Sequence, residues 1–114
     1  MRYTVDMPKP TPSSVPVVPP KVARLSESQV KGGLKALKEW GQSGEALQRT
    51  YKFKDFVEAM KFVSQVAGAA EADQHHPDIL IRWNLVTLTL TTHDAGGISE
   101  KDFALARKAD AMAK

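Results

Sequence analysis

The feature that most constrains this chain is an alternating segment near its C-terminal end, Val86-Thr87-Leu88-Thr89-Leu90-Thr91-Thr92. Successive side chains of a β-strand point to opposite faces, so Val86, Leu88 and Leu90 share one face and threonines share the other. This pattern predicts a sheet with one apolar and one polar face. Other elements must cover the apolar face, and a chain of 114 residues has room for one such domain.

Two hairpins account for the predicted strands. The first spans Trp40–Phe53, with a glycine-containing turn followed by alternating apolar and polar residues. The second pairs Ile79–Trp83 with Val86–Thr92 and places the turn at Asn84 and Leu85. Together they supply four strands that follow one another in antiparallel fashion.

Three helices are predicted around these strands. The first starts at Ser26, the N-cap of a capping box, and runs to about Glu39. The second runs from about Lys54 to Asp73, and the third is capped by Ser99. The apolar face of the second helix consists of Phe56, Met60, Val63, Ala67 and Ala70. The order α-β-β-α-β-β-α predicts an α+β fold, a four-stranded antiparallel sheet with three helices packed on one face.

The N-terminal segment differs from the rest of the chain. Six of the seven prolines lie there, and proline lacks the amide hydrogen and fixes φ, so a helix or a central strand is excluded. We expect residues 1–24 to form a proline-rich, disordered tail and residues 25–114 to form the domain. A proline-motif docking peptide is a second interpretation of the tail, and it rests on Pro16–Pro19 alone.

Composition excludes several classes of function. The chain has no cysteine, which excludes disulfides, thiolate nucleophiles, iron–sulfur clusters and zinc ribbons. The sixteen Lys and Arg residues form no long run, so we expect no nucleic-acid partner. No apolar segment approaches the ~20 residues that cross a membrane, and the N-terminus lacks the apolar core of a secretory signal. We therefore expect a cytoplasmic protein without a membrane partner.

All three histidines, His75, His76 and His93, lie within nineteen residues. If the pleat of the last strand continues, His93 falls on its threonine face. Histidine exchanges protons near neutral pH, so one interpretation is a general acid–base site. A zinc site is disfavoured, because adjacent histidines on an extended backbone point apart. In the third interpretation, His75 and His76 only end a helix, where imidazolium complements the helix dipole.

Two acidic residues accompany the histidines. Glu71 lies one helical turn before His75, on the same face of the second helix. Asp102 follows Ser99 by three residues, the spacing of a capping box, so capping of the last helix is its favoured role. Neither residue identifies a site by itself.

These residues belong to one spaced pattern, Glu71-x3-His75-His76-Pro77-x5-Trp83-x9-His93-x8-Asp102. The pattern resembles the signature of the pterin-4a-carbinolamine dehydratase family, with every element in register. The similarity extends from about Leu25 to Met112 and includes residues 51–56, 91–97 and 103–106. The fold of that family has the α-β-β-α-β-β-α order predicted above.

The resemblance implies dehydration of a 4a-hydroxytetrahydropterin to quinonoid dihydropterin, with the pterin as substrate and no cofactor or metal. It implies that His75 and His93 are the acid–base residues and that His76 holds or polarises the leaving hydroxyl. Glu71 would orient His75 or the pterin edge. The other pocket-lining residues would be Gln74, Thr91 and Thr92.

One position departs from the family pattern. Many members have an acidic residue where this chain has Gln74, which leaves less negative charge to support an imidazolium but keeps a hydrogen-bonding group. Members commonly form homodimers or homotetramers, and we expect the same here. Non-catalytic relatives act as assembly chaperones for RuBisCO, and this is the alternative function that the resemblance allows.

Overall fold

The structure is a computed structural model that describes residues 22–114. Its elements are α1 (Glu27–Leu34), β1 (Gly41–Ser43), β2 (Ala46–Lys52), α2 (Phe56–Asp73), β3 (Asp78–Arg82), β4 (Leu85–Leu90), the 3-10 turn η1 (His93–Ala95) and α3 (Glu100–Met112). Among these helices, none has the length and apolar character needed to cross a membrane. The predicted tail lies outside the described residues except for its last three, so the domain division stays a prediction.

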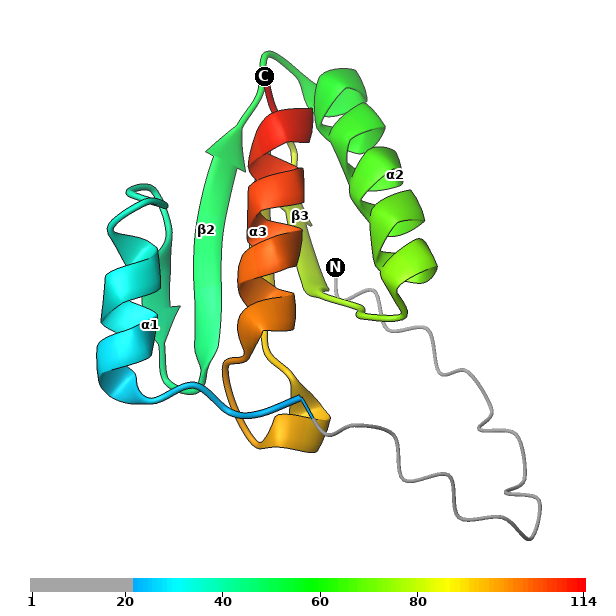
Figure 1. The fold of residues 1–114 in the computed structure, drawn as a ribbon. Coiled ribbons are helices and arrows are strands. Elements are labelled where there is room, and N and C mark those ends of the chain that lie inside the picture. The colour runs from blue at the N-terminus through cyan, green and yellow to red at the C-terminus, as the bar shows by residue number, and fades with distance from the viewer. Residues whose placement is uncertain (1–21) are drawn as a thin grey trace, which may run out of the picture.

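The four strands form one antiparallel sheet in the order β1-β2-β4-β3. Leu88 at the centre of β4 lies opposite Arg49 of β2 and Ile79 of β3. Val86, Leu88 and Leu90 are fully buried, and Thr87 and Thr89 are partly exposed. In Figure 1 the three helices lie on the viewer's side of this sheet. The predicted α+β fold and its order of elements are therefore confirmed.

The first helix is shorter than predicted. Its capping box at Ser26 is present, but α1 ends at Leu34 rather than near Glu39. Two glycines in its last turn lower its intrinsic stability. Gly33 is required by packing, because a Cβ at this position would lie 2.6 Å from Cε1 of Phe103 on α3. The glycine thus lets α1 approach α3 closely.

The turn of the second hairpin lies one residue earlier than predicted. Trp83 and Asn84 form the turn, and Leu85 is already in β4. Asn84 is held by Phe53, whose backbone N–H donates to the Asn84 carbonyl at 2.8 Å and whose carbonyl accepts from Asn84 Nδ2 at 3.0 Å. Leu85 is left to pair with Lys52 of β2. The local sequence of the second hairpin could not predict this contact, because Phe53 is 31 residues away from Asn84 in the chain.

A carboxylate near the end of α3 ties this helix to the first hairpin. Asp110 Oδ1 accepts hydrogen bonds from Trp40 Nε1 at 2.9 Å, Arg49 Nη1 at 2.7 Å and the Tyr51 hydroxyl at 2.5 Å. The Arg49 guanidinium also lies 4.1 Å from the centroid of the Tyr51 ring. Burial, and after it the hydrogen bond to Asp110, raises the pKa of Tyr51 above its ordinary value. One side chain of α3 therefore fixes three groups from the first hairpin and the loop before it.

We predict that Asp110→Ala lowers the free energy of unfolding by about 2–4 kcal/mol, because three donors lose their acceptor in a partly buried site. Urea unfolding followed by circular dichroism measures this change. Glu100→Ala is the matched control on the same helix, since its ion pair with Arg107 is exposed, and it should cost less than about 1 kcal/mol. Equal losses in the two variants would contradict the role given to Asp110.

A second prediction concerns alkaline pH. The raised pKa of Tyr51 keeps the phenol protonated in the folded protein above pH ~10, where the unfolded chain ionises it. Stability should therefore fall as the pH rises above about 10, by up to about 1.4 kcal/mol per pH unit from this group. Tyr51→Phe removes this component, so unfolding measured between pH 8 and pH 11.5 should show a shallower loss. Identical pH dependence in both proteins would argue against a buried, protonated phenol.

Candidate active site

The histidine pair lies where α2 ends. Gln74 caps the helix in the left-handed conformation, with a φ of 52° that is uncommon for a residue other than glycine. The backbone N–H of His75 then donates to the carbonyl of Ala70 at 3.0 Å, which closes the helix end. Pro77 prevents the helix from continuing. The sharp turn at Gln74 sends His75 and His76 into different surroundings.

His75 is buried against α3. Its Nε2 lies 2.5 Å from Oδ1 of Asp102, a residue with no exposed surface. An ionised carboxylate can only accept, so Nε2 carries the hydrogen, and in the neutral imidazole Nδ1 then keeps its lone pair. Within residues 22–114, Nδ1 makes no hydrogen bond. His75 is therefore fixed in one tautomer with an available proton acceptor.

The second oxygen of Asp102 completes a buried network. Oδ2 accepts from the backbone N–H of Ser99 and from Oγ1 of Thr92, each at 2.9 Å. The hydroxyl of Ser99 lies 2.5 Å from Thr92 Oγ1 and acts as the donor there, because the Thr92 hydrogen goes to Asp102. The predicted capping role of Asp102 is confirmed. The hydrogen bond to His75 was not predicted, because the spacing of a capping box does not indicate the partner of the second carboxylate oxygen, Oδ1.

Glu71 contacts His76 instead of His75. Its Oε1 lies 3.3 Å from His76 Nε2 and 3.2 Å from Nε2 of Gln74, which also donates to the Glu71 carbonyl at 2.8 Å. Of the two roles expected for Glu71, orienting His75 or the pterin edge, the first has no contact to support it, because the left-handed turn at Gln74 carries His75 off the helix face. A glutamine at this position donates to Glu71, which a carboxylate could not do.

The two adjacent histidines line separate cavities. His75 lines a cavity of about 290 Å³ together with Asp73, Lys101, Ala104 and Lys108. His76 lines another, of about 270 Å³, with Glu71, Pro77 and residues of α2. His93 lines neither of these cavities.

The segment after β4 does not continue the pleat. The strand ends at Leu90, Thr92 forms a bridge with Gly97, and His93 begins the 3-10 turn. Thr91 Oγ1 donates to the carbonyl of Glu45 at 2.7 Å, whereas Thr92 joins the buried Asp102 network. The exposed His93 side chain makes no hydrogen bond to any described residue. Of the predicted site residues, the structure thus brings together His75 with Thr92, and His76 with Glu71 and Gln74.

These groups can transfer protons. His75 is held by a hydrogen bond to a buried carboxylate, and His76 has an acidic partner. The part of the chain that the structure describes contains no group of three or more His, Asp or Glu residues placed to hold a metal ion. The arrangement suits acid–base chemistry on a small molecule.

Comparison with known proteins shows the family to which this chain belongs. The family model described as pterin 4 alpha carbinolamine dehydratase matches residues 23–112. The chain belongs to this family.

Two sequence relatives share most of the domain. A protein of Thermomicrobium roseum is 55% identical over 87 residues, which are 76% of this chain and 94% of the relative. One of Koribacter versatilis is 50% identical over 82 residues, 72% of this chain and 87% of the relative. Both are named pterin-4-alpha-carbinolamine dehydratase on a provisional basis.

Two solved structures share the fold. The transcriptional coactivator/pterin dehydratase of Brucella melitensis has a TM-score of 0.78 and 42% identity, and the match covers 80% of this chain and 99% of that one. A pterin dehydratase-like protein identified as a RuBisCO assembly factor in the α-carboxysome has a TM-score of 0.58 and 27% identity. This match covers 66% of this chain and 89% of that one. A protein of similar structure is therefore described with a different role.

We predict that Asp102→Asn reverses the tautomer of His75. The asparagine oxygen would stay on Ser99 and Thr92, so its amino group would face Nε2 and force that nitrogen to accept. Nitrogen-15 NMR above the imidazole pKa should then report an Nε2-bound hydrogen in the wild type and an Nδ1-bound hydrogen in the variant. Glu71→Gln is the control and should leave His75 unchanged. The same tautomer of His75 in wild type and Asp102→Asn would refute the arrangement.

Proposed function

We propose that this protein is a dehydratase that converts a 4a-hydroxytetrahydropterin to quinonoid dihydropterin and water. The observation that carries the proposal is the pairing of His75 with the buried Asp102, because it leaves Nδ1 of a tautomer-fixed imidazole free to take a proton. Membership of the pterin 4 alpha carbinolamine dehydratase family supports the substrate class.

The reaction needs one proton removed and one proton supplied. The N5–H bond of the substrate breaks and its electron pair forms the C4a=N5 double bond. The C4a–O bond breaks at the same time, and the hydroxyl leaves as water after it gains a proton. The chain returns to its starting state when the base passes its proton back to the acid through solvent. No electrons are exchanged, so no redox partner is needed.

We assign His75 as the base, because the carboxylate of Asp102 stabilises the imidazolium that forms when Nδ1 takes the N5 proton. His93 would supply the proton to the leaving hydroxyl, and its side chain is exposed and unengaged among the described residues. His76, supported by Glu71, would hold the hydroxyl, so the pterin would have to extend from the cavity that His75 lines to the one that His76 and Glu71 line. An acid or a base in position each contributes typically about 10²–10⁴-fold in rate.

Glu71 would recognise the pterin edge. The pyrimidinone ring of a pterin presents an N–H and an amino group side by side, a donor pair that a carboxylate accepts in a bidentate manner. Gln74 and His76 approach Oε1 of Glu71 and hold the carboxylate in place. Thr91 and Thr92 would border the site from the end of β4, with Thr92 acting through Asp102.

The proposal includes a homodimer or homotetramer in the cytoplasm. A domain of this size gains stability from association, since it buries only about two thirds of its unfolded surface alone. β3 is an edge strand of the sheet, and Leu80 on it is 47% exposed. Phe56 and Val57 at the start of α2 are also exposed large apolar residues.

Assembly of RuBisCO is the second candidate function. It is favoured by the likeness to the α-carboxysome assembly factor. That likeness is weaker than the likeness to the Brucella pterin dehydratase, with a TM-score of 0.58 against 0.78 and an identity of 27% against 42%. The His75–Asp102 pair has a structural role and can also serve acid–base chemistry, which an assembly role does not require. We therefore favour the dehydratase.

The test is the decay of freshly prepared 4a-hydroxytetrahydropterin, followed by ultraviolet absorbance. Wild-type protein should accelerate the decay, and His75→Ala/His93→Ala should lose at least about 10²-fold of this acceleration because both proton-transfer groups are gone. Lys31→Ala/Lys38→Ala, at two exposed positions in and after α1, is the matched control and should keep the wild-type rate.

No acceleration by folded wild-type protein would overturn the dehydratase. A double histidine variant as fast as the wild type would overturn the assigned roles. In the first case, co-expression with RuBisCO subunits and measurement of the assembled enzyme would test the second candidate.

A further inference from the structure

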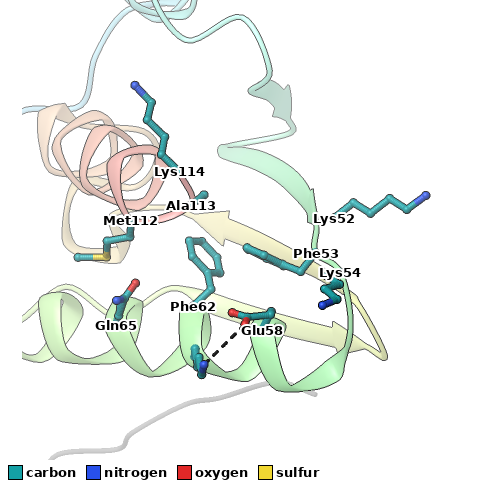
Figure 2. Close-up of a pocket in the computed structure, with 10 residues that line it drawn as sticks. Lys52, Phe53, Lys54, Glu58, Phe62, Gln65, Met112, Ala113 and Lys114 are labelled. Carbon is teal, nitrogen blue, oxygen red and sulfur yellow. Dashed lines mark ion pairs between the residues drawn. The ribbon is translucent and has the colours of Figure 1, made fainter.

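A separate cavity of about 470 Å³ lies at the end of the domain opposite the histidine pair (Figure 2). The end of β2, the first turns of α2 and the end of α3 line it. Glu58 in this lining is fifteen residues before Asp73, the last residue of α2, which is about 22 Å along the helix axis at 1.5 Å per residue. The cavity is therefore distinct from the proposed dehydratase site.

The floor of this cavity is aromatic. The rings of Phe53 and Phe62 have centroids 4.9 Å apart and planes inclined by 37°. Phe62 is buried, Phe53 is partly exposed, and Met112 of α3 lies beside them. Figure 2 shows the two rings next to each other, with the Met112 side chain on the other side of Phe62 from Phe53. Aromatic rings and a polarisable thioether suit contact with a flat apolar group.

The rim is positively charged. Lys52, Lys54, Lys61 and Lys114 line the cavity with a single carboxylate, that of Glu58. Glu58 is 3.6 Å from Lys61, and the other three ammonium groups have no ion pair with any residue that the structure describes. In Figure 2, Lys52 and Lys114 extend outward from the rim on flexible stems. Three lysines at the edge of the cavity therefore make no ion pair within residues 22–114.

Helix electrostatics do not account for this cluster. Lys114 lies just beyond the C-terminal end of α3, where a cation is favourable. Lys54 and Lys52, however, lie just before the N-terminal end of α2, where the helix dipole disfavours positive charge. An anion in the cavity would offset the repulsion of Lys52 and Lys54 by the positive end of the α2 dipole.

We propose that this cavity binds a small aromatic anion, a flat ring that carries a phosphate or carboxylate group. The ring would lie on the partly exposed Phe53, which packs on the buried Phe62, and the side chains of Lys54 and Lys114 would turn toward the anionic group from the positions seen in Figure 2. A volume of about 470 Å³ lies within the range of ~300–1,000 Å³ that is usual for small-molecule sites. The concave aromatic floor favours a small molecule over an extended polyanion.

Titration of the full chain, nitrogen-15 labelled, with phenyl phosphate tests the proposal by NMR. Saturable shifts should centre on the amides of residues 52–58, Phe62 and Met112. Inorganic phosphate and phenol, which each supply half of the ligand, should bind at least about tenfold more weakly. Lys54→Gln/Lys114→Gln should weaken binding of phenyl phosphate by roughly fivefold. Lys31→Gln/Lys38→Gln removes the same charge elsewhere and should have no effect.

Three outcomes would overturn the proposal. They are the absence of saturable shifts, shifts spread over lysines across the whole surface, and equal binding of phenyl phosphate to the two lysine variants. Binding of phenol as tight as that of phenyl phosphate would also contradict it, since charge would then play no part. The dehydration rate of Lys54→Gln/Lys114→Gln should equal that of the wild type, so this test and the test of the dehydratase fail independently.

Discussion

The buried carboxylate of Asp102 is the interaction on which the histidine site depends. A charge without exposed surface is costly unless hydrogen bonds compensate it, and Asp102 receives them from three separate segments. Ser99 precedes α3, Thr92 follows β4, and His75 follows α2. The same group therefore caps one helix, fixes the end of a strand and orients an imidazole. Proper folding of these three segments is a condition for the geometry of His75.

A second carboxylate has the corresponding structural role at the other end of α3. Asp110 gathers Trp40, Arg49 and Tyr51 from the first hairpin and the loop before it. α3 is thus anchored to the sheet at both ends by carboxylates, one of which also serves the candidate active site. The lysine-rimmed cavity lies beside the end of α3 that Asp110 holds. This division places proton-transfer groups and the proposed anion site at opposite ends of the same two helices.

The sequence predicted the order of the elements, because their signals are local. It predicted the buried face of α2 only in part, since Phe56 is exposed and Ala59, Phe62 and Val66 are buried with Val63 and Ala70. The alternation after Val86 and the capping spacings at Ser26 and Ser99 each depend on neighbours within a few residues. The pairing of acids with histidines was not predictable in this way. It depends on the left-handed conformation of Gln74, for which glutamine gives no local signal, and on which face of α3 meets the end of α2. The family resemblance supplied the residues of the site but not their contacts.

The most direct test of the account is a crystal structure of this protein with a stable dihydropterin bound. The account predicts that Nδ1 of His75 lies within about 3 Å of N5 of the pterin, a distance at which a proton can pass. It also predicts that Nε2 of His75 keeps its hydrogen bond to Asp102 and that Glu71 accepts hydrogen bonds from the pyrimidinone edge of the pterin. A pterin bound away from His75, or a His75 ring turned so that Nδ1 faces Asp102, would contradict the central claim.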